Sequence, residues 1–142
     1  MSDVVELNEA VLPVAAGRRV GAYLELTKTR IIGLVLVVVA VGFFLSLRTQ
    51  ADWAAVALLL HTMLGTALVA GGANALNQYL ETDYDGQMVR TQDRPLPSGR
   101  LCRAEALAFG VGIAVTGMLY LALQVNLLCA LLAGLTLTSY VF

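Results

Sequence analysis

Four long uncharged stretches alternate with short polar segments along this sequence. The uncharged stretches are residues 31–47, 53–76, 106–123 and 126–142. A helix that crosses the hydrocarbon core of a bilayer needs about 20 residues, with a range of roughly 17–25. The first three stretches have this length, and the fourth has it only if Phe142 already lies at the far interface. Because lipid offers the backbone no hydrogen-bonding partners, each stretch should be helical, which predicts an all-α, polytopic transmembrane helix bundle of about four spans.

The composition agrees with a chain that has lipid as its solvent. Hydrophobic residues make up 58% of the 142 residues and charged residues only 13%, whereas charged residues are about 25% of a soluble domain. The net charge of −1 gives no information about partners, and we expect no nucleic-acid partner. Cys102 and Cys129 lack the spacing of a metal or redox site, so we expect both to be reduced, structural residues.

The basic residues predict how the chain is oriented in the membrane. Only Arg48 falls in the short segment between the first two spans. The other eight precede the first span or lie between the second and third: Arg18, Arg19, Lys28, Arg30, Arg90, Arg94, Arg100 and Arg103. By the positive-inside rule, we expect the N-terminus and the 77–105 loop to be cytoplasmic.

The remaining segments predict how the spans are connected. Residues 1–20 form a leader with little pattern, and residues 21–142 form one transmembrane domain, with an interfacial helix at 20–30 leading into the first span. A tight hairpin at 48–52 joins the first two spans. The second span is rich in small residues, which allow close helix approach, so we expect it to lie inside the bundle.

The polar segment after the second span should begin as helix and end as loop. Asp85-Gly86 is a plausible helix end, with Gly86 free to take the left-handed conformation. Residues 94–99, Arg-Pro-Leu-Pro-Ser-Gly, should form an ordered loop because proline cannot continue a helix.

A polar stripe lies at the end of this predicted helix. Asn74, Asn77, Glu81 and Asp85 recur at steps of three or four residues, so their side chains fall on one helix face. Mg²⁺ prefers oxygen ligands and is usually bound by one or two carboxylates together with substrate phosphates. We therefore interpret Asn77, Glu81 and Asp85 as catalytic metal ligands. The alternative is that Glu81 and Asp85 are solvated loop charges without a ligand. Asp83 lies off the stripe and is not included among the metal ligands.

Four basic residues could bind phosphate on the same side of the membrane. Arg90 and Arg94 follow the stripe with their own four-residue spacing, and Lys28 and Arg30 precede the first span. Guanidinium groups bind phosphate oxygens in pairs of hydrogen bonds, and the Lys28 ammonium could reach the same phosphate as a point charge. We therefore interpret all four residues as diphosphate-binding. The alternative is that they only set the topology. For His61, within the second span, we favour a neutral side chain hydrogen-bonded between helices over a functional role.

Two motifs resemble a known family. The pattern Asn-x-x-x-Glu-x-x-x-Asp at 77–85, followed by Arg-Thr-x-x-Arg-Pro-Leu-x-Ser-Gly at 90–99, resembles the first aspartate-rich motif of the UbiA superfamily of intramembrane prenyltransferases. Leu-Thr-Lys-Thr-Arg at 26–30 is similar to the opening signature of one branch, the protohaem IX farnesyltransferases or haem O synthases. Glu81 stands where the superfamily usually has aspartate, and Thr29 where the branch has proline.

The resemblance implies a function and a larger molecule. It implies transfer of a farnesyl group from farnesyl diphosphate to a vinyl group of haem B, giving haem O, with Mg²⁺ as cofactor, in the bacterial cytoplasmic (inner) membrane. Superfamily members are bundles of about nine helices with a second acidic motif in the later half. This sequence resembles their first half, so we expect a fragment or truncated product that needs a C-terminal half. The alternatives are transfer to an aromatic acceptor in quinone or chlorophyll biosynthesis, and a noncatalytic membrane protein.

Overall fold

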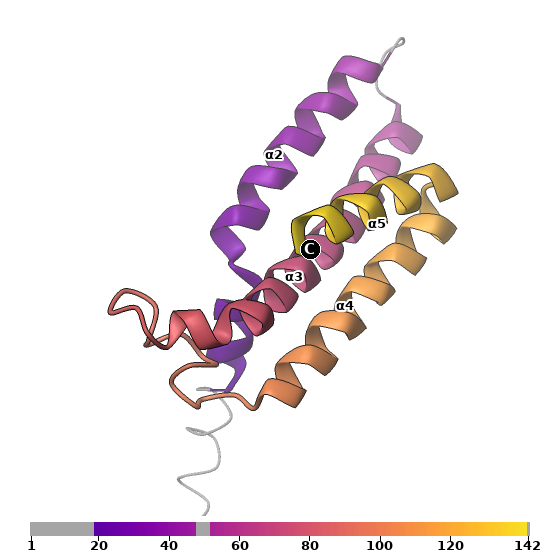
Figure 1. The fold of residues 1–142 in the computed structure, drawn as a ribbon. Coiled ribbons are helices and arrows are strands. Elements are labelled where there is room, and N and C mark those ends of the chain that lie inside the picture. The colour runs from indigo at the N-terminus through magenta and orange to yellow at the C-terminus, as the bar shows by residue number, and fades with distance from the viewer. Residues whose placement is uncertain (1–18, 48–51, 142) are drawn as a thin grey trace, which may run out of the picture.

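Five helical segments make up the part of the chain that the structure describes. The structure, a computed structural model, describes residues 19–47 and 52–141. No strand occurs in these ranges, and the expected all-α class is confirmed. Residues 19–27 are helical, and the helices that follow are α2 (Thr29–Ser46), α3 (Trp53–Asp85), α4 (Arg103–Gln124) and α5 (Leu127–Val141) (Figure 1). The expectations for residues 1–18, for hairpin residues 48–51 and for Phe142 lie outside the described residues.

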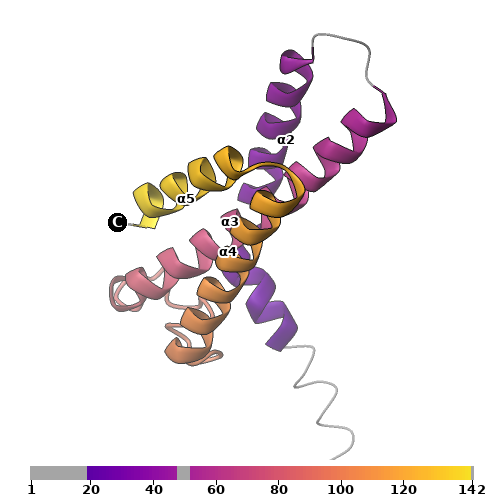
Figure 2. The same cartoon turned by 90° about the vertical axis from the view of Figure 1, so that its right-hand side faces the viewer.

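Three of these helices are long and apolar enough to cross a membrane. They are α2, α3 and α4, with 18, 33 and 22 residues. The fourth predicted span is α5, which has 15 residues and is shorter than the roughly 17–25 residues of a membrane-crossing helix. Figure 2 shows α5 leaving the far end of α4, while the segment 19–27 and the loop 86–102 lie together at the opposite end. We call that opposite end the loop end.

Helix α3 is longer than the hydrocarbon core is thick. At about 1.5 Å per residue, its 33 residues extend over roughly 50 Å, whereas the core measures about 30 Å. The helix begins after Asp52, whose Oδ1 accepts a hydrogen bond of 2.8 Å from the N–H of Ala55. Its apolar part, 53–76, is long enough to cross the membrane. The last turns therefore extend beyond the hydrocarbon core and carry their polar residues to the membrane surface.

The chain leaves α3 without the left-handed glycine that the sequence predicted. The helix ends at Asp85, which confirms the predicted helix end, but Gly86 has φ −66° and ψ −21°, a right-handed conformation, so the left-handed conformation expected there was wrong. The chain continues beyond α3 in further right-handed turns, which the Thr91 hydroxyl stabilises by donating to the Asp85 carbonyl at 2.9 Å. The left-handed glycine is instead Gly99, with φ 71°.

Small residues bring α3 and α4 into close contact. The buried residues of α4 recur every three or four positions and so form one face. They are Ala106, Gly110, Ala114, Gly117 and Leu121. A Cβ atom added to Gly72 of α3 would lie 2.6 Å from the Ala114 Cβ and 2.7 Å from the Gly110 carbonyl oxygen. Such residues let helix backbones approach closely in lipid, and the expectation that the second span lies inside the bundle is confirmed.

A buried apolar cluster holds the loop end together. Its members come from the segment 19–27, α3, the loop 86–102 and α4. They are Ala22, Leu26, Ala75, Leu96, Leu101 and Ala106. Beside this cluster the Tyr23 ring packs on Phe109, with ring centroids 4.8 Å apart. Because four segments share one cluster, packing against α3 positions both the entry segment and the loop.

Candidate functional site

The helix that enters the bundle is interrupted at Lys28. Residues 19–27 are helical, Lys28 has φ 50° and ψ 60°, and α2 begins at Thr29. The expected interfacial helix at 20–30 therefore ends at residue 27, before the first span begins. A non-glycine residue in the left-handed region is uncommon and persists only where its surroundings hold it there. The break also creates a helix N-terminus, whose first N–H groups have no intrahelical partner.

Four basic residues line one open cavity at the loop end, which we call the basic cavity. It has a volume of about 600 Å³. The four are the predicted diphosphate-binding residues Lys28, Arg30, Arg90 and Arg94. Two of them come from the helix break and the first turn of α2, and two come from the loop that follows α3. The fold thus brings together basic residues from two distant parts of the sequence, and Gln78 of α3 lines the same cavity.

Glu81 and Asp85 converge on the guanidinium group of Arg94. The Nη1 atom of Arg94 lies 2.5 Å from Asp85 Oδ2 and 3.7 Å from Glu81 Oε2. The Asp85 side chain is 7% exposed, whereas the Glu81 side chain is 47% exposed. Asp85 and Arg94 therefore form a close, largely buried pair, and the Glu81 side chain is half exposed. Arg94 lines the basic cavity, whereas neither carboxylate does. Because both carboxylates reach one cationic atom, the same oxygens could be shared by a small hard cation.

The third predicted metal ligand, Asn77, lies one turn before Glu81 on α3 and is half-buried. Within the described ranges, no group of three His, Cys, Asp or Glu residues is arranged to hold a metal ion. Mg²⁺ bound together with substrate phosphates needs only one or two carboxylates. The pair Glu81 and Asp85, with the amide oxygen of Asn77, is thus a donor set of the right chemistry.

The environment of Lys28 favours the binding of an anion. Burial lowers the pKa of Lys28 below its ordinary value, and the nearby Arg94 guanidinium lowers it further. Glu81 and Asp85 raise the same pKa but do not cancel the lowering. An ammonium group that is partly desolvated and lies near another cation is stabilised by a nearby anion. A polyanion in the basic cavity would supply that charge.

The buried polar face of α3 differs from the predicted stripe. Its residues are Asn74, Gln78, Thr82 and Asp85. Asn77, which the prediction included, is only half-buried. The prediction missed Gln78 and Thr82, although Gln78 follows Asn74 by four residues, the spacing that places two side chains on one face. That spacing was the available signal.

Other charged or polar side chains form pairs outside the basic cavity. His61 Nδ1 and Tyr120 Oη are hydrogen-bonded at 2.6 Å between α3 and α4, which confirms the expected interhelical role. Asp83 forms an ion pair with Arg103 of α4. Both cysteines are free thiols within the described part of the chain, as expected.

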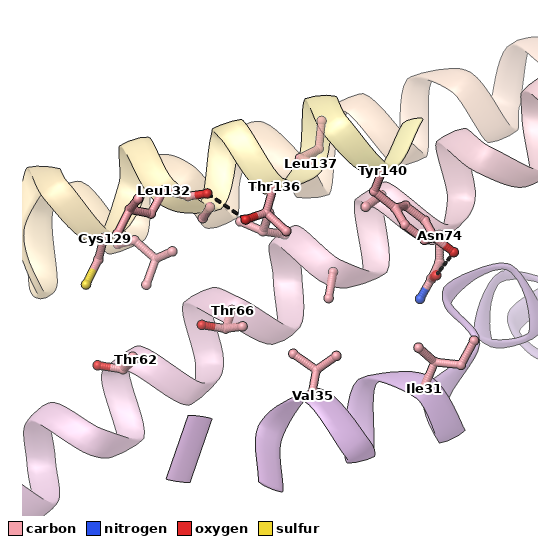
Figure 3. Close-up of a pocket in the computed structure, with 15 residues that line it drawn as sticks. Ile31, Val35, Thr62, Thr66, Asn74, Cys129, Leu132, Thr136, Leu137 and Tyr140 are labelled. Atoms are coloured by element: carbon pink, nitrogen blue, oxygen red, sulfur yellow. Dashed lines mark hydrogen bonds between the residues drawn. The ribbon is translucent and has the colours of Figure 1, made fainter. Parts of the chain in front are cut away.

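A second, largely apolar cavity adjoins the basic one. This apolar cavity has a volume of about 410 Å³ and is lined by α2, α3 and α5, together with Leu121 of α4. Figure 3 shows Ile31 and Val35 of α2 on one side of it and the helix α5 on the other. At one end, Tyr140 donates a hydrogen bond of 3.3 Å to Asn74 Oδ1. Ile31 lines both cavities, so the two cavities are neighbours on either side of the first turn of α2. Adjoining cavities of this kind suit a ligand with an anionic head and an apolar tail.

Comparison with known proteins agrees with this chemistry. The model of the UbiA prenyltransferase family matches residues 34–142. The chain is 46% identical over 126 residues to the protoheme IX farnesyltransferase of Solibacter usitatus, covering 84% of this chain and 43% of the relative. It is 44% identical over 125 residues to the enzyme of that name from Streptomyces avermitilis, a match that covers 88% of this chain and 40% of the relative. For the Rhodopseudomonas palustris enzyme of that name the identity is 36% over 140 residues, and the match covers 97% of this chain and 44% of the relative.

These matches cover only part of each relative. The chain spans less than half the length of these curated relatives. No solved structure matches it. With its three apolar helices of membrane-crossing length, the chain is that of an integral membrane protein.

Proposed function

Because the chain belongs to the UbiA prenyltransferase family, we propose that the protein transfers a farnesyl group from farnesyl diphosphate to a vinyl group of haem B, giving haem O. The observation that carries this proposal is that the basic and apolar cavities share the lining residue Ile31. A prenyl diphosphate has the matching division into a charged head and an apolar tail. The name shared by the relatives, protoheme IX farnesyltransferase, supports the choice of donor and acceptor.

In this proposal the basic cavity binds the diphosphate. Arg90 and Arg94 pair with phosphate oxygens, each guanidinium through two hydrogen bonds, and Lys28 and Arg30 add charge from the other wall. The N-terminus of α2 lines the same cavity through Thr29. Its free N–H groups and its helix dipole favour an anion at that point.

Asn77, Glu81 and Asp85 would hold the Mg²⁺ that accompanies the diphosphate. The convergence of two carboxylates on Arg94 supports this assignment, because the guanidinium stands where a cation is stabilised. Bound there, Mg²⁺ would neutralise phosphate charge and make the diphosphate a better leaving group. Arg94 can pair with Asp85 or with a phosphate oxygen, so it would link the metal ligands to the diphosphate-binding cavity.

The chemistry then depends on charge and on the exclusion of water. As the bond between the farnesyl carbon and the diphosphate oxygen breaks, the basic residues stabilise the negative charge that develops on the departing group. The terminal vinyl carbon of haem B attacks the resulting allylic cation and forms the new carbon–carbon bond, which leaves a positive charge on the adjacent carbon. Water then adds to that carbon and releases a proton, which gives the hydroxyl group of haem O. Apolar walls such as Ile31 and Val35 hold the isoprenoid tail and keep water from the cation.

We also propose an orientation in the bacterial cytoplasmic (inner) membrane. The N-terminus and the 77–105 loop would be cytoplasmic, because Arg90, Arg94, Arg100 and Arg103 all lie in that loop. The basic cavity would then open toward the side on which a soluble diphosphate product can leave.

An acceptor assay tests the proposed function. The protein, together with the C-terminal half that the resemblance implies, would be incubated in membranes with farnesyl diphosphate, Mg²⁺ and either haem B or 4-hydroxybenzoate, and the products identified by mass spectrometry. We expect farnesylated haem with the first acceptor and no product with the second. Prenylation of the aromatic acceptor alone would contradict the assignment and would favour quinone biosynthesis. Omitting Mg²⁺ should abolish the haem product.

A further inference from the structure

The break at Lys28 leaves carbonyl groups that a continuous helix would have satisfied. In an unbroken helix the carbonyls of residues 24–27 would accept hydrogen bonds from the N–H groups of residues 28–31. Here the Lys28 N–H donates to the Glu25 carbonyl at 3.3 Å, and the Ile31 N–H donates to the Lys28 carbonyl at 2.8 Å, so neither reaches the carbonyl four residues before it. The carbonyls at the end of the segment 19–27 therefore need other donors.

Two amide side chains of α3 supply most of these donors. Asn74 Nδ2 donates to the Thr27 carbonyl at 2.8 Å. Gln78 Nε2 donates to the carbonyls of Glu25 and Leu26 at 3.2 Å and 3.1 Å. The Thr27 hydroxyl donates a hydrogen bond of 2.9 Å to the Leu24 carbonyl. The two amides are four residues apart on α3, so they lie one turn apart on one face and cap the neighbouring segment together.

The burial of Gln78 indicates that stability alone does not explain its position. Its residue surface is 3% exposed, and its Oε1 has no hydrogen-bond partner among the described residues. A buried acceptor without a donor is unfavourable, so an apolar residue would suit this position better if the side chain served only packing. What Gln78 contributes is its amide donor, which is directed at the helix break.

We propose that Asn74 and Gln78 are positioning residues for the diphosphate site. By capping the segment 19–27 from α3, they favour a broken helix over a continuous one. The break holds Lys28 in its left-handed conformation and places the first turn of α2 on the wall of the basic cavity. In a continuous helix, Lys28 and the free N–H groups beside it would point elsewhere. This inference rests on the proposed function of the basic cavity.

The chain offers a direct probe, because Lys28 is the one lysine of the sequence. The full protein in detergent would be treated with acetic anhydride at increasing concentrations of inorganic diphosphate with Mg²⁺. Mass spectrometry of the peptide that contains Lys28 then gives the diphosphate concentration that halves its acetylation. Asn74→Leu and Gln78→Leu remove the amide donors, and leucine has the same branching as asparagine and one heavy atom fewer than glutamine. Gln124→Leu makes the same change at an exposed position at the end of α4 and is the matched control.

We expect the half-protecting concentration to rise about tenfold in each of the two α3 variants, which corresponds to about 1.4 kcal/mol. The Gln124→Leu protein should match the unmodified one. Equal protection of the unmodified protein and of both α3 variants would overturn this inference and leave the proposed function intact. If diphosphate fails to protect Lys28 even in the unmodified protein, the proposed function of the cavity is wrong.

A shorter amide keeps the test valid if the leucine variants do not fold. Gln78→Asn retains a buried amide but withdraws its donor by one carbon–carbon bond, about 1.5 Å. We expect this variant to keep its helix content by circular dichroism while its half-protecting concentration rises. Full protection of a folded Gln78→Asn protein at the original concentration would overturn the inference.

Discussion

The two ends of α3 contact their neighbours through different chemistry. In its membrane part, Gly65 and Gly72 lie against α4 at distances that leave no room for a Cβ atom. At the loop end, the same helix presents amides and carboxylates to the segment 19–27 and to Arg94. Lipid provides no hydrophobic driving force between helices, so close packing holds the first region. The second region extends beyond the hydrocarbon core, where charged groups are hydrated and can form the site.

This difference separates stability from function along one helix. A change in the membrane part of α3 should weaken its packing against α4. A change at the loop end should leave the packing intact and impair binding. Variants at the two ends, each paired with a matched change elsewhere in the chain, can therefore be told apart by what they impair.

The largest effect is expected at Asp85. Asp85→Asn removes the charge that pairs with Arg94 and, in the proposed function, a metal ligand. We expect farnesyl transfer to fall by about two orders of magnitude or more, as when one preorganised charge-stabilising group is lost. Membrane insertion and helix content should not change. Asp52→Asn is the control, since it makes the same substitution at the opposite end of α3 and asparagine is an equally good helix cap. Near-normal turnover of the Asp85 variant would contradict the metal assignment.

The second effect tests the membrane part. Gly72→Leu would force a side chain against Ala114 and the Gly110 backbone. We expect destabilisation of about 1–3 kcal/mol, the usual range for overpacking, measured as a lower midpoint of unfolding in detergent. The control is Gly112→Leu on α4, because a Cβ atom there has no neighbour within 4 Å. Both variants gain the same helix propensity, so only the packing differs. Equal midpoints would contradict the close α3–α4 contact.

The features behind these two predictions are visible in the sequence to different degrees. The spans were predictable because an uncharged, apolar stretch of the required length is typical of a membrane-crossing helix. Glu81 and Asp85 were predictable as neighbours because a four-residue spacing places side chains on one helix face. Their shared contact with Arg94 was not, because it depends on the path of the loop after α3.

The role of Gln78 could not be predicted from local pattern. Its partners, the carbonyls of Glu25 and Leu26, lie about fifty positions away in the sequence. A helix break is satisfied here by side chains from another helix, and no rule of local spacing describes that arrangement. For a similar reason, the conformation of Gly86 followed from the turns beyond it rather than from its own freedom.

A smaller effect should appear as a pH dependence of diphosphate binding. Burial and Arg94 lower the pKa of Lys28, against the opposing effect of Glu81 and Asp85. Since the protonated amine binds the anion, affinity should fall as pH rises, and at a lower pH than for an exposed lysine. The arginine of the Lys28→Arg variant stays charged as the pH rises. This variant should therefore lose no affinity through deprotonation of residue 28, and its pH dependence should report only the ionisation of diphosphate. Calorimetric titrations over a pH series measure both. Identical profiles would contradict the role of Lys28.

The smallest effect is expected between α3 and α4 at Tyr120. Tyr120→Phe removes the hydrogen bond to His61. Interhelical hydrogen bonds in membrane proteins contribute on average about 0.6 kcal/mol, so the unfolding midpoint should fall only slightly and farnesyl transfer should be unchanged. A large loss of transfer would show that His61 belongs to the site.

The measurement that tests the central claim most directly is the binding of a non-reactive prenyl diphosphate. Farnesyl thiodiphosphate would be titrated into the protein in nanodiscs, with and without Mg²⁺, alongside the Asp85→Asn variant and inorganic diphosphate. Because the two cavities share the lining residue Ile31, we predict that the farnesyl compound binds more tightly than inorganic diphosphate. We also predict that its binding requires both Mg²⁺ and Asp85. Equal affinity for the two compounds, or binding that needs neither Mg²⁺ nor Asp85, would contradict the account.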